Sequence, residues 1–309
     1  MRENVYKPEI ATILNIRLEA GGGRPIRTFK VQVDDQLARP KFLHKPGQFG
    51  FLNAFGEGES VFAIFNTPNT DGILEFSVMK VGNVTSRLHD MEVGDKVGVR
   101  GPYGNDFPVE EWKGKELVFI GAGIGISPVR SVYQYVLAPE NRQEYGKVVL
   151  IYGARTPFDL VYKEDFKALD ERDDLDLWLC IDWKFGPKGP IEGDAAAGWP
   201  AIDMQVPSET IIPAGVNKFT CFVPQLVEVV KPNAANAIAV TCGPPLAIQF
   251  ISQALDRLGW KPEQVYTTLE NRMKCGIGKC GRCNVGGTYV CKDGPVYSSA
   301  EIMNMKNEF

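Results

Sequence analysis

Apolar and polar side chains alternate in short runs along the first third of the chain. The runs are rich in β-branched and aromatic residues, and clusters of Gly, Pro and Asp separate them. Alternation with a period of two is typical of strands with one buried face, and regular turn signals between short strands indicate an antiparallel barrel. We therefore expect an antiparallel β-barrel over residues 1–108, with strands in IATILNIRLEA, RTFKVQVD, GFLNAF, SVFAIF, LEFSVMKVG and DKVGVRGPYG.

One segment of this region, TSRLHDMEVGD, has the spacing of a helix instead. A hydroxyl side chain before the first apolar position is a common N-cap, because its oxygen accepts a free backbone N–H. Thr85 or Ser86 is therefore expected to be the N-cap of this helix.

From about residue 113 the pattern changes to apolar runs that alternate with segments of helical spacing. The runs KELVFIGAGIG, KVVLIYGAR, LDLWLCIDW and AIAVTCGPP are typical of buried strands, and SPVRSVYQYVLA, LVYKEDFKALDER and LAIQFISQALDRLG are typical of helices. Pro128 is expected at the first position of its helix, and Gly259 at the end of the last one. This alternation indicates a parallel α/β sheet over residues 109–261.

Residues 184–218 interrupt the α/β domain with a stretch rich in Gly, Pro and Ala. A loop of this length in a compact domain is usually a lid over a site, an insertion that contacts a partner, or disordered, and the sequence does not select among these. Residues 262–309 then form a third segment, a tail that contains four of the seven cysteines.

The composition is that of a globular protein, with 44% hydrophobic and 23% charged residues. A formal net charge of -4 gives no reason to expect nucleic acid or an anionic membrane as a partner. No apolar run reaches the roughly twenty residues of a membrane span, and the N-terminus MRENVYKPEI lacks the apolar region of a secretory signal. We therefore expect a cytoplasmic protein, in which clustered cysteines bind metal more often than they form disulfides.

The tail cysteines have the spacing C-x4-C-x2-C-x7-C, whose first three members match the plant-type spacing of a [2Fe–2S] cluster. Glycines between them suit a loop that needs positive φ angles and N–H groups directed at sulfur, and cations beside them suit an anionic cluster. A structural zinc ion or simple buried thiols are the alternatives, although zinc sites usually pair two C-x2-C hooks. The cysteines are Cys275, Cys280, Cys283 and Cys291, the glycines Gly276, Gly278 and Gly281, and the cations Lys274, Lys279 and Arg282.

Gly121, Gly123 and Gly125 lie between an expected strand and the N-terminus of an expected helix. Glycines at such a turn let the backbone approach a pyrophosphate, and the helix end supplies free N–H groups and a positive dipole. The context favours nucleotide binding over glycines that serve packing alone.

The remaining cysteines and the histidines lie outside these motifs. Cys242 follows a strand, at the edge where ligands of open α/β sheets bind, and it is either a packed thiol or a residue that faces a nicotinamide. Cys180 and Cys221 are expected in or near the core. His44 and His89 are the only histidines, and we expect both on the surface rather than in catalysis.

Taken in order, these segments resemble the ferredoxin-NADP⁺ reductase superfamily. Within it they resemble the flavin and [2Fe–2S] electron-transfer subunits, such as those of dihydroorotate dehydrogenase and anaerobic sulfite reductase and the gamma subunit of cytoplasmic NAD(P)-linked nickel-iron hydrogenases. The short gap before Cys291 is more similar to the sulfite reductase and hydrogenase subunits. The resemblance covers nearly the whole chain except residues 184–218, and its segments are KPGQF, VGNVTSRLHDMEVGDKVGVRGPYG, GAGIGISPVRS, YGARTP, CGPP, ENRMKCGIGKCGRC and YVCKDGPVY.

The resemblance implies an FAD-binding barrel, an NAD(P)-binding α/β domain and a C-terminal [2Fe–2S] tail ligated by the four tail cysteines. It implies a flavin site made of Phe62, Ala63 and Ile64 on a strand and of Gly82, Asn83, Val84, Thr85 and Ser86 around the pyrophosphate. It also implies a nicotinamide dinucleotide site made of Gly121, Gly123, Gly125, Ile126, Ser127 and Pro128 at the pyrophosphate, Tyr152, Gly153, Ala154 and Arg155 near the ribose, and Cys242, Gly243, Pro244 and Pro245 near the nicotinamide.

The flavin strand, ESVFAIFN, departs from the family's pattern. The family usually carries an arginine for the pyrophosphate and a hydroxyl near the isoalloxazine, where this chain has Ser60 and Ala63. We therefore expect flavin binding to be less secure than cluster binding, and the redox tuning of the flavin to differ from the family's.

The three cofactors suggest an order of electron transfer. A nicotinamide gives up two electrons as hydride, an iron–sulfur cluster takes one at a time, and flavin does both. We expect electrons to pass from NAD(P)H to FAD to [2Fe–2S] and on to a catalytic or electron-accepting subunit of a hetero-oligomeric complex, or in the reverse direction. The alternatives are a self-contained NAD(P)H flavin reductase for a small acceptor and a non-enzymatic iron–sulfur redox sensor or assembly subunit. Arg155 could meet a 2′-phosphate, but the choice between NADH and NADPH stays open.

Overall fold

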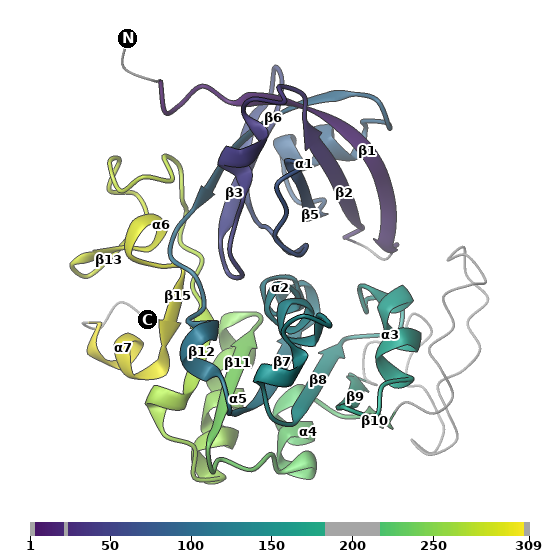
Figure 1. Ribbon diagram of the computed structural model, residues 1–309, viewed down its shortest axis with the longest axis vertical. Helices are drawn as coiled ribbons and strands as arrows, with labels where there is room; N and C mark the ends of the chain where they lie inside the picture. Colours follow the sequence, from purple (N-terminus) through teal and green to yellow (C-terminus); the bar gives the residue numbers. More distant parts are fainter. Residues whose placement is uncertain (1–3, 22–23, 183–216, 306–309) are drawn as a thin grey trace.

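The computed structural model describes residues 4–21, 24–182 and 217–305, which contain two large β-sheets stacked with a helix between them (Figure 1). Most of the segment that we expect to be an insertion, residues 184–218, lies outside the described residues. None of the helices in the described ranges has both the length and the apolar character that crossing a bilayer requires.

The N-terminal sheet is antiparallel and curls into a barrel. Its strands follow the order β4-β3-β6-β1-β2-β5, and the outer strands approach each other where the Phe65 N–H donates to the Glu75 carbonyl (3.3 Å). Inward-facing residues such as Ile13, Phe29 and Phe76 are fully buried, as the alternating pattern predicts. The strands are β1 (Glu9–Ala20), β2 (Ile26–Val33), β3 (Phe49–Ala54), β4 (Gly58–Ala63), β5 (Ile73–Met79) and β6 (Lys96–Tyr103).

Helix α1 (Asn83–His89) contacts β3 and β4 and begins earlier than the sequence predicts. Gly82 is its N-cap, so the prediction of Thr85 or Ser86 at that position was wrong. Thr85 lies in the first turn, where its Oγ1 accepts N–H bonds from Val81 and Gly82 (both 2.9 Å). The Thr85 hydroxyl thus accepts free backbone N–H groups from within the first turn rather than from the N-cap position. The presence of a hydroxyl residue in the sequence does not distinguish these two positions.

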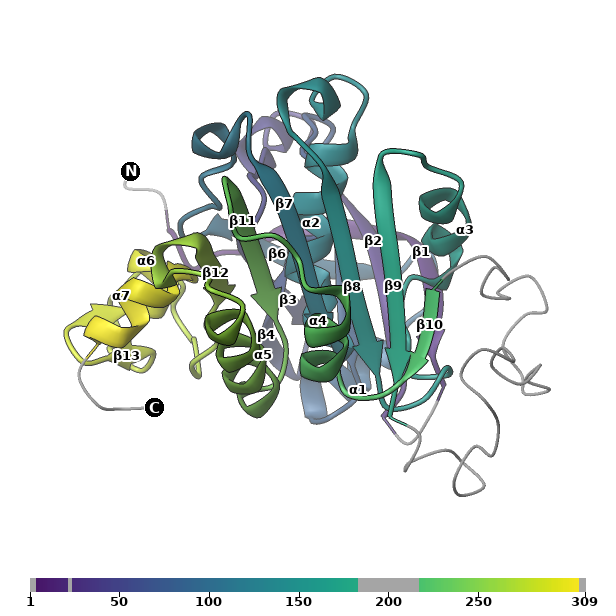
Figure 2. The same ribbon diagram turned by 90° about the horizontal axis from the view of Figure 1, so that it is seen from below.

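The second sheet has seven strands, and helices cover both of its faces (Figures 1 and 2). Helices α2 and α3 bury the face toward the barrel, whereas α4 and α5 cover the opposite face. The order is β10-β9-β8-β7-β11-β12-β15, with all neighbours parallel except β12 and β15, which confirms the predicted α/β class. The elements are β7 (Glu116–Ala122), α2 (Ile126–Leu137), β8 (Val148–Ala154), α3 (Lys163–Asp170), β9 (Leu175–Ile181), β10 (Asn217–Thr220), α4 (Val223–Val230), β11 (Ala237–Cys242), α5 (Pro245–Arg257), β12 (Val265–Thr268) and β15 (Val296–Ser298).

Three local features of this domain differ from the prediction or extend it. Strand β10 and helix α4 were not predicted, because four and eight residues are too few to establish a period. Helix α2 begins at Ile126 with Gly125 as its N-cap, so Pro128 lies in the first turn rather than at the first position. Gly259 does follow the last long helix, with a left-handed φ of 84°.

The tail begins within the second sheet and returns to it. Strand β12 pairs with β11, the cysteine-bearing segment follows, and β15 then pairs with β12. The segment contains β13 (Asn284–Val285), β14 (Thr288–Tyr289) and α6 (Val290–Asp293), and α7 (Ser299–Asn304) follows β15. Single 3₁₀ turns occur at η1 (Arg39–Phe42), η2 (Val109–Trp112), η3 (Gly123–Gly125), η4 (Arg142–Glu144) and η7 (Pro262–Gln264).

Buried polar groups connect the barrel to the second domain. The Tyr162 hydroxyl lies 2.7 Å from Ser77 Oγ on β5 and 2.6 Å from Ser127 Oγ in the first turn of α2. The backbone N–H of Tyr162 donates to the carboxylate of Glu19 at the end of β1 (2.9 Å). Because directional bonds between buried groups have few alternatives, this network holds the start of α2 at a defined place below the barrel.

His44 and His89 are buried, so the expectation that they lie on the surface was wrong. Nε2 of His44 lies 2.9 Å from the Asn66 carbonyl, and Nε2 of His89 lies 2.8 Å from the Val78 carbonyl. A carbonyl only accepts, so each neutral ring carries its proton on Nε2. Burial lowers the pKa of both imidazoles below the ordinary value, because it penalises the charged form.

These lowered pKa values predict a loss of stability in mild acid. Above about pH 6.5 the histidines are neutral in both states, and as pH falls below that value the unfolded chain takes up protons that the native state refuses. The free energy of unfolding should therefore fall below about pH 6.5, by up to about 1.4 kcal/mol per pH unit for each histidine, until the lower native pKa is reached. Urea unfolding of the wild type and of a His44→Gln, His89→Gln double variant measures this, and an equal pH dependence in both would contradict it.

Candidate cofactor sites

The carboxyl ends of β7, β8 and β11 meet at one edge of the second sheet. Gly121 is the register partner of both Tyr152 and Cys242, so the three expected nucleotide segments are neighbours in space. Ligands of open parallel sheets bind at this edge, and the N-terminus of α2 adds a partial positive charge there. The structure thus brings the loop at 121–128, the end of β8 and the turn at 242–245 into one site.

Steric contacts explain why glycine occupies two of these turns. A Cβ on Gly125 would lie 2.5 Å from Gly243 Cα, and a Cβ on Gly121 would lie 2.3 Å from the Ile126 side chain. Such distances are far below van der Waals contact. The two loops therefore approach each other only because Gly125 lacks a side chain, and the turn after β7 closes on Ile126 only because Gly121 lacks one. The half-buried backbone of Gly123, Gly125 and Gly243 in this double turn is a suitable cradle for a pyrophosphate.

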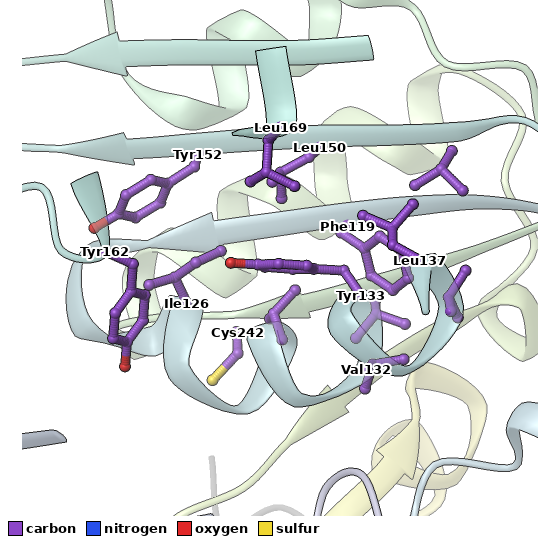
Figure 3. Close-up of a cluster of buried hydrophobic side chains, with 14 of the residues drawn as sticks. Phe119, Ile126, Val132, Tyr133, Leu137, Leu150, Tyr152, Tyr162, Leu169 and Cys242 are labelled. Atoms are coloured by element: carbon purple, nitrogen blue, oxygen red, sulfur yellow. The ribbon is translucent and has the colours of Figure 1, made fainter. Parts of the chain in front are cut away.

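Several of the predicted residues direct their side chains into the core instead. Ile126 and Tyr152 belong to the cluster of buried side chains in Figure 3, where Tyr152 accepts the Val161 N–H at its hydroxyl (3.0 Å). Ser127 Oγ donates to the Ile124 carbonyl (2.9 Å). These residues can therefore serve a bound nucleotide through their backbone, whereas Arg155 has an exposed side chain at the end of β8.

Cys242 lies at the end of β11 beside the same core cluster, and only 7% of its surface is exposed (Figure 3). Its Sγ is 3.1 Å from Thr268 Oγ1 on the neighbouring strand. Burial raises the pKa of the thiol to about 12, so it is a neutral donor or acceptor and not a thiolate nucleophile.

Glu270 is a site residue that the sequence prediction missed. It follows β12, and its negative charge helps to raise the pKa of the Cys242 thiol, so it lies near the same edge of the sheet. Although Glu270 reaches the surface, the protein around its carboxyl removes enough water to raise its pKa. Glu270 comes two residues after Thr268, which contacts Cys242. This spacing indicates that Glu270 is near Cys242 only when β12 is known to be the neighbour of β11.

The two parts of the expected flavin site meet on the barrel. Helix α1 contacts β4, and the side chains of Phe62 and Val84 both pack against the barrel core. Ile64 is fully buried, while Gly82 and Asn83 are exposed at the start of α1. Ser60 and Ala63, which we expect at the positions of the family's arginine and hydroxyl, are half-buried on β4. The departure from the family pattern therefore lies at positions that a cofactor could reach.

The cysteine loop already directs backbone donors at sulfur. The Gly278 N–H donates to Cys291 Sγ (3.2 Å), and the N–H groups of Lys279 and Cys280 donate to Cys275 Sγ (3.3 and 3.4 Å). Gly276, Gly278 and Gly281 make this possible with left-handed φ angles of 78°, 69° and 71°. Burial opposes ionisation of Cys275, but the backbone N–H groups of Ile277, Cys280 and Lys279 outweigh it and lower the pKa of the thiol to about 6.

The four thiols are arranged as two pairs. The thiol of Cys280 lies beside that of Cys275, and the thiol of Cys283 beside that of Cys291. No three potential ligand side chains in the described ranges converge on the position of one metal ion. Two pairs suit a [2Fe–2S] cluster, in which each iron takes two protein ligands, better than they suit a single tetrahedral zinc ion. Cys180 is buried and Cys221 half-buried, as expected.

The surface around the loop is basic. Cys280 is the exposed member of the four, whereas the other three are buried. No residue between 271 and 292 is acidic, and five in this range are cations with exposed side chains. They are Arg272, Lys274, Lys279, Arg282 and Lys292.

Two family models match the chain. An oxidoreductase NAD-binding domain matches residues 119–210, and the iron-sulfur cluster binding domain of dihydroorotate dehydrogenase B matches residues 270–303. The second match contains all four cysteines of the loop.

Relatives and solved structures agree with these matches. The chain is 36% identical to sulfhydrogenase 1 subunit gamma of Pyrococcus furiosus, over 90% of this chain and 87% of the relative. It is 32% identical to a probable dihydroorotate dehydrogenase B (NAD(+)) electron transfer subunit of Methanocaldococcus jannaschii, over 94% and 90%. The fold is similar to that of an NADH-dependent reduced ferredoxin-NADP oxidoreductase (TM-score 0.67, 18% identity, covering 100% and 95%). It is also similar to a ferredoxin NADP+ reductase from Neisseria gonorrhoeae (TM-score 0.60, 19% identity, covering 84% and 98%).

The contact of Gly125 with Gly243 predicts the effect of a single methyl group. Gly125→Ala should push the two turns apart, reduce the free energy of unfolding by about 1–3 kcal/mol and weaken binding of NADH or NADPH. Chemical denaturation and calorimetric titration with each nucleotide measure the two effects. Gly287→Ala is the matched control, because a Cβ there meets nothing within 4 Å and its φ is not in the left-handed region. Unchanged nucleotide affinity in Gly125→Ala would show that this turn does not bind the nucleotide.

Proposed function

The chain belongs to the family of sulfhydrogenase gamma subunits and dihydroorotate dehydrogenase B electron-transfer subunits, and we propose that it transfers electrons between NAD(P)H and a partner subunit through FAD and a [2Fe–2S] cluster. The observation that carries the proposal is the cysteine loop, in which backbone donors already point at paired thiols beside the barrel. A bound FAD would supply the conversion between two-electron hydride chemistry and one-electron chemistry.

At the nicotinamide end, the protein positions the dinucleotide through its backbone. The one cysteine beside the nicotinamide, Cys242, is kept as a neutral thiol and so does not compete as a nucleophile. The turn at Gly121–Gly125 and the N-terminus of α2 hold the pyrophosphate, while Gly243 allows close approach. The neutral thiol of Cys242, fixed by Thr268, gives the nicotinamide ring a small and uncharged neighbour. Glu270 contributes a carboxyl at the same edge of the sheet, and burial raises its pKa.

At the cluster end, the exposed Cys280 and its basic surroundings face away from the protein's own core. Electrons transferred between proteins require the two redox groups to approach closely, so the exposed ligand marks the face that the partner subunit contacts. The five cations around the loop favour a partner with an acidic surface there. The basic patch contrasts with the chain's net charge of -4, so it would orient the partner on encounter. The cytoplasmic location and the choice between NADH and NADPH stay predictions.

Anaerobic reconstitution tests the function directly. The protein, loaded with FAD, iron and sulfide, should show flavin and cluster absorption that NADH or NADPH bleaches, and a reduced-cluster EPR signal. Cys283→Ser should abolish the cluster absorption but keep nucleotide-dependent bleaching of the flavin, because Cys283 lies in the loop and away from the nucleotide edge. Cys221→Ser, outside the loop, is the control and should keep both. A wild-type protein that binds no flavin and does not respond to either nucleotide would refute the proposal.

Cys242 offers a separate test of the nicotinamide site. Cys242→Ala removes the sulfur beside Thr268 and should slow flavin reduction by NAD(P)H by about tenfold to a hundredfold, the scale expected for a misplaced reactant. Stopped-flow reduction of the flavin measures this rate, and iron content should be unaffected. A rate equal to that of the wild type would contradict a role for Cys242 at the nicotinamide and would show that it is only a packed thiol.

A further inference from the structure

A buried cation lies between the flavin strand and the cysteine loop. Arg100 on β6 has only 2% of its side chain exposed, and its guanidinium makes a bidentate ion pair with Glu59 on β4 (2.9 and 2.6 Å). Its Nη1 also donates to the carbonyl of Cys275, the first cysteine of the loop (3.3 Å). Arg100 therefore connects the strand expected to face the flavin with the backbone of a cluster ligand.

Aromatic rings hold this guanidinium in place. The Arg100 Cζ lies 4.6 Å from the centre of the Phe51 ring and 5.6 Å from that of Tyr103, whose hydroxyl accepts an N–H from Nη1 (3.1 Å). The same two rings support the loop, because a Cβ on Gly276 would lie 2.8 Å from Phe51 and 2.9 Å from Tyr103. A planar cation stacked on aromatic rings loses little side-chain freedom when it forms such bonds.

A bulge in β6 creates this arrangement. Phe51 pairs with Arg100 and Phe49 pairs with Tyr103, so one residue of β3 lies opposite two residues of β6 between these pairs. Without the extra residue, positions 100 and 103 would point to opposite faces of the strand. Gly101, with a φ of 130° and a Cβ position only 3.1 Å from the backbone of β3, allows the bulge. The segment RGPYG therefore places both side chains against the cysteine loop.

We propose that Arg100 and Glu59 form a charge pair that positions Cys275 and sets the reduction potential of the cluster. The proposal rests on the proposed function, since it requires a [2Fe–2S] cluster in the loop. Arg100 acts through the Cys275 backbone and through its charge, so it is a positioning residue and not a catalytic one. Reduction adds a negative charge to a cluster, and nearby charge and hydrogen bonding tune its potential.

Substitution of Arg100 and substitution of Glu59 should shift the reduction potential of the cluster in opposite directions. Arg100→Met removes a cation near the loop and leaves Glu59 unpaired, so reduction becomes less favourable and the potential falls. Glu59→Gln leaves the cation without its counter-charge, so the potential rises. Loss of packing or of loop order alone would not reverse sign between the two variants. The double variant, which has no net change in charge, should return close to the wild-type value.

The experiment is an EPR-monitored redox titration of the reconstituted full-length protein. We expect each single variant to shift the one-electron equilibrium of the cluster about tenfold, in opposite directions, which corresponds to about 59 mV. Arg100→Lys keeps the charge but not the bidentate geometry, so it should shift the potential less than Arg100→Met. Arg257→Gln, an exposed arginine on α5, is the control for loss of a surface charge.

The outcomes separate this inference from the proposed function. A wild-type protein that assembles no cluster defeats the proposed function itself. A wild-type cluster whose potential stays constant in Glu59→Gln and Arg100→Met, or moves in the same direction in both, overturns the role of the pair. If Arg100→Met fails to hold a cluster, the other two variants decide. A raised potential in Glu59→Gln together with a small shift in Arg100→Lys supports the role of the pair. A potential that does not rise in Glu59→Gln overturns it.

Discussion

The short antiparallel pairing of β15 with β12 fixes the position of the cysteine loop. Three register partners join these strands, and the entire cysteine segment lies between them in the chain. Asn105, at the junction of the barrel and the second domain, bonds both the N–H and the carbonyl of Val296 on β15 (2.9 and 2.8 Å). The barrel and the second sheet are thus attached to the same strand. Because the loop is closed at both ends, its sulfur atoms have one location relative to the barrel, beside β3 and β6.

The same attachment arranges the three candidate sites in a sequence. The nucleotide edge lies at the carboxyl ends of β7, β8 and β11, next to helix α2, which packs between the two sheets (Figure 1). On β4, Phe62 packs toward the barrel core, whereas Val61 packs toward the cluster of side chains that contains Cys275. Adjacent residues of a strand face opposite sides, so β4 contacts both the barrel core and the side chains around the cysteine loop.

Much of the fold could be predicted because its signals are local. Alternation in the first third of the chain predicts the barrel strands, and apolar runs that end in glycine predict β7 and its turn. The predictions that failed concern positions where tertiary contacts decide between local alternatives. Thr85 can cap a helix from the N-cap or from its first turn, and only the packing of α1 on β4 selects the second. His44 and His89 are polar by type, but a carbonyl within the barrel accepts from one ring nitrogen of each and so allows burial.

The sequence by itself determined the chemistry that this protein can perform, because the spacing of Cys275, Cys280, Cys283 and Cys291 and the glycines around them are local properties of the chain. It also determined the two main fold classes, since hydrophobic period is a property of each segment. Only the tertiary structure decided which distant residues act together. Glu270 joins Cys242, and Arg100 joins Glu59 and the Cys275 carbonyl, through strand order and a β-bulge that no local pattern encodes. The physical reason is that these contacts depend on which strands become neighbours, and burial of the whole chain decides that.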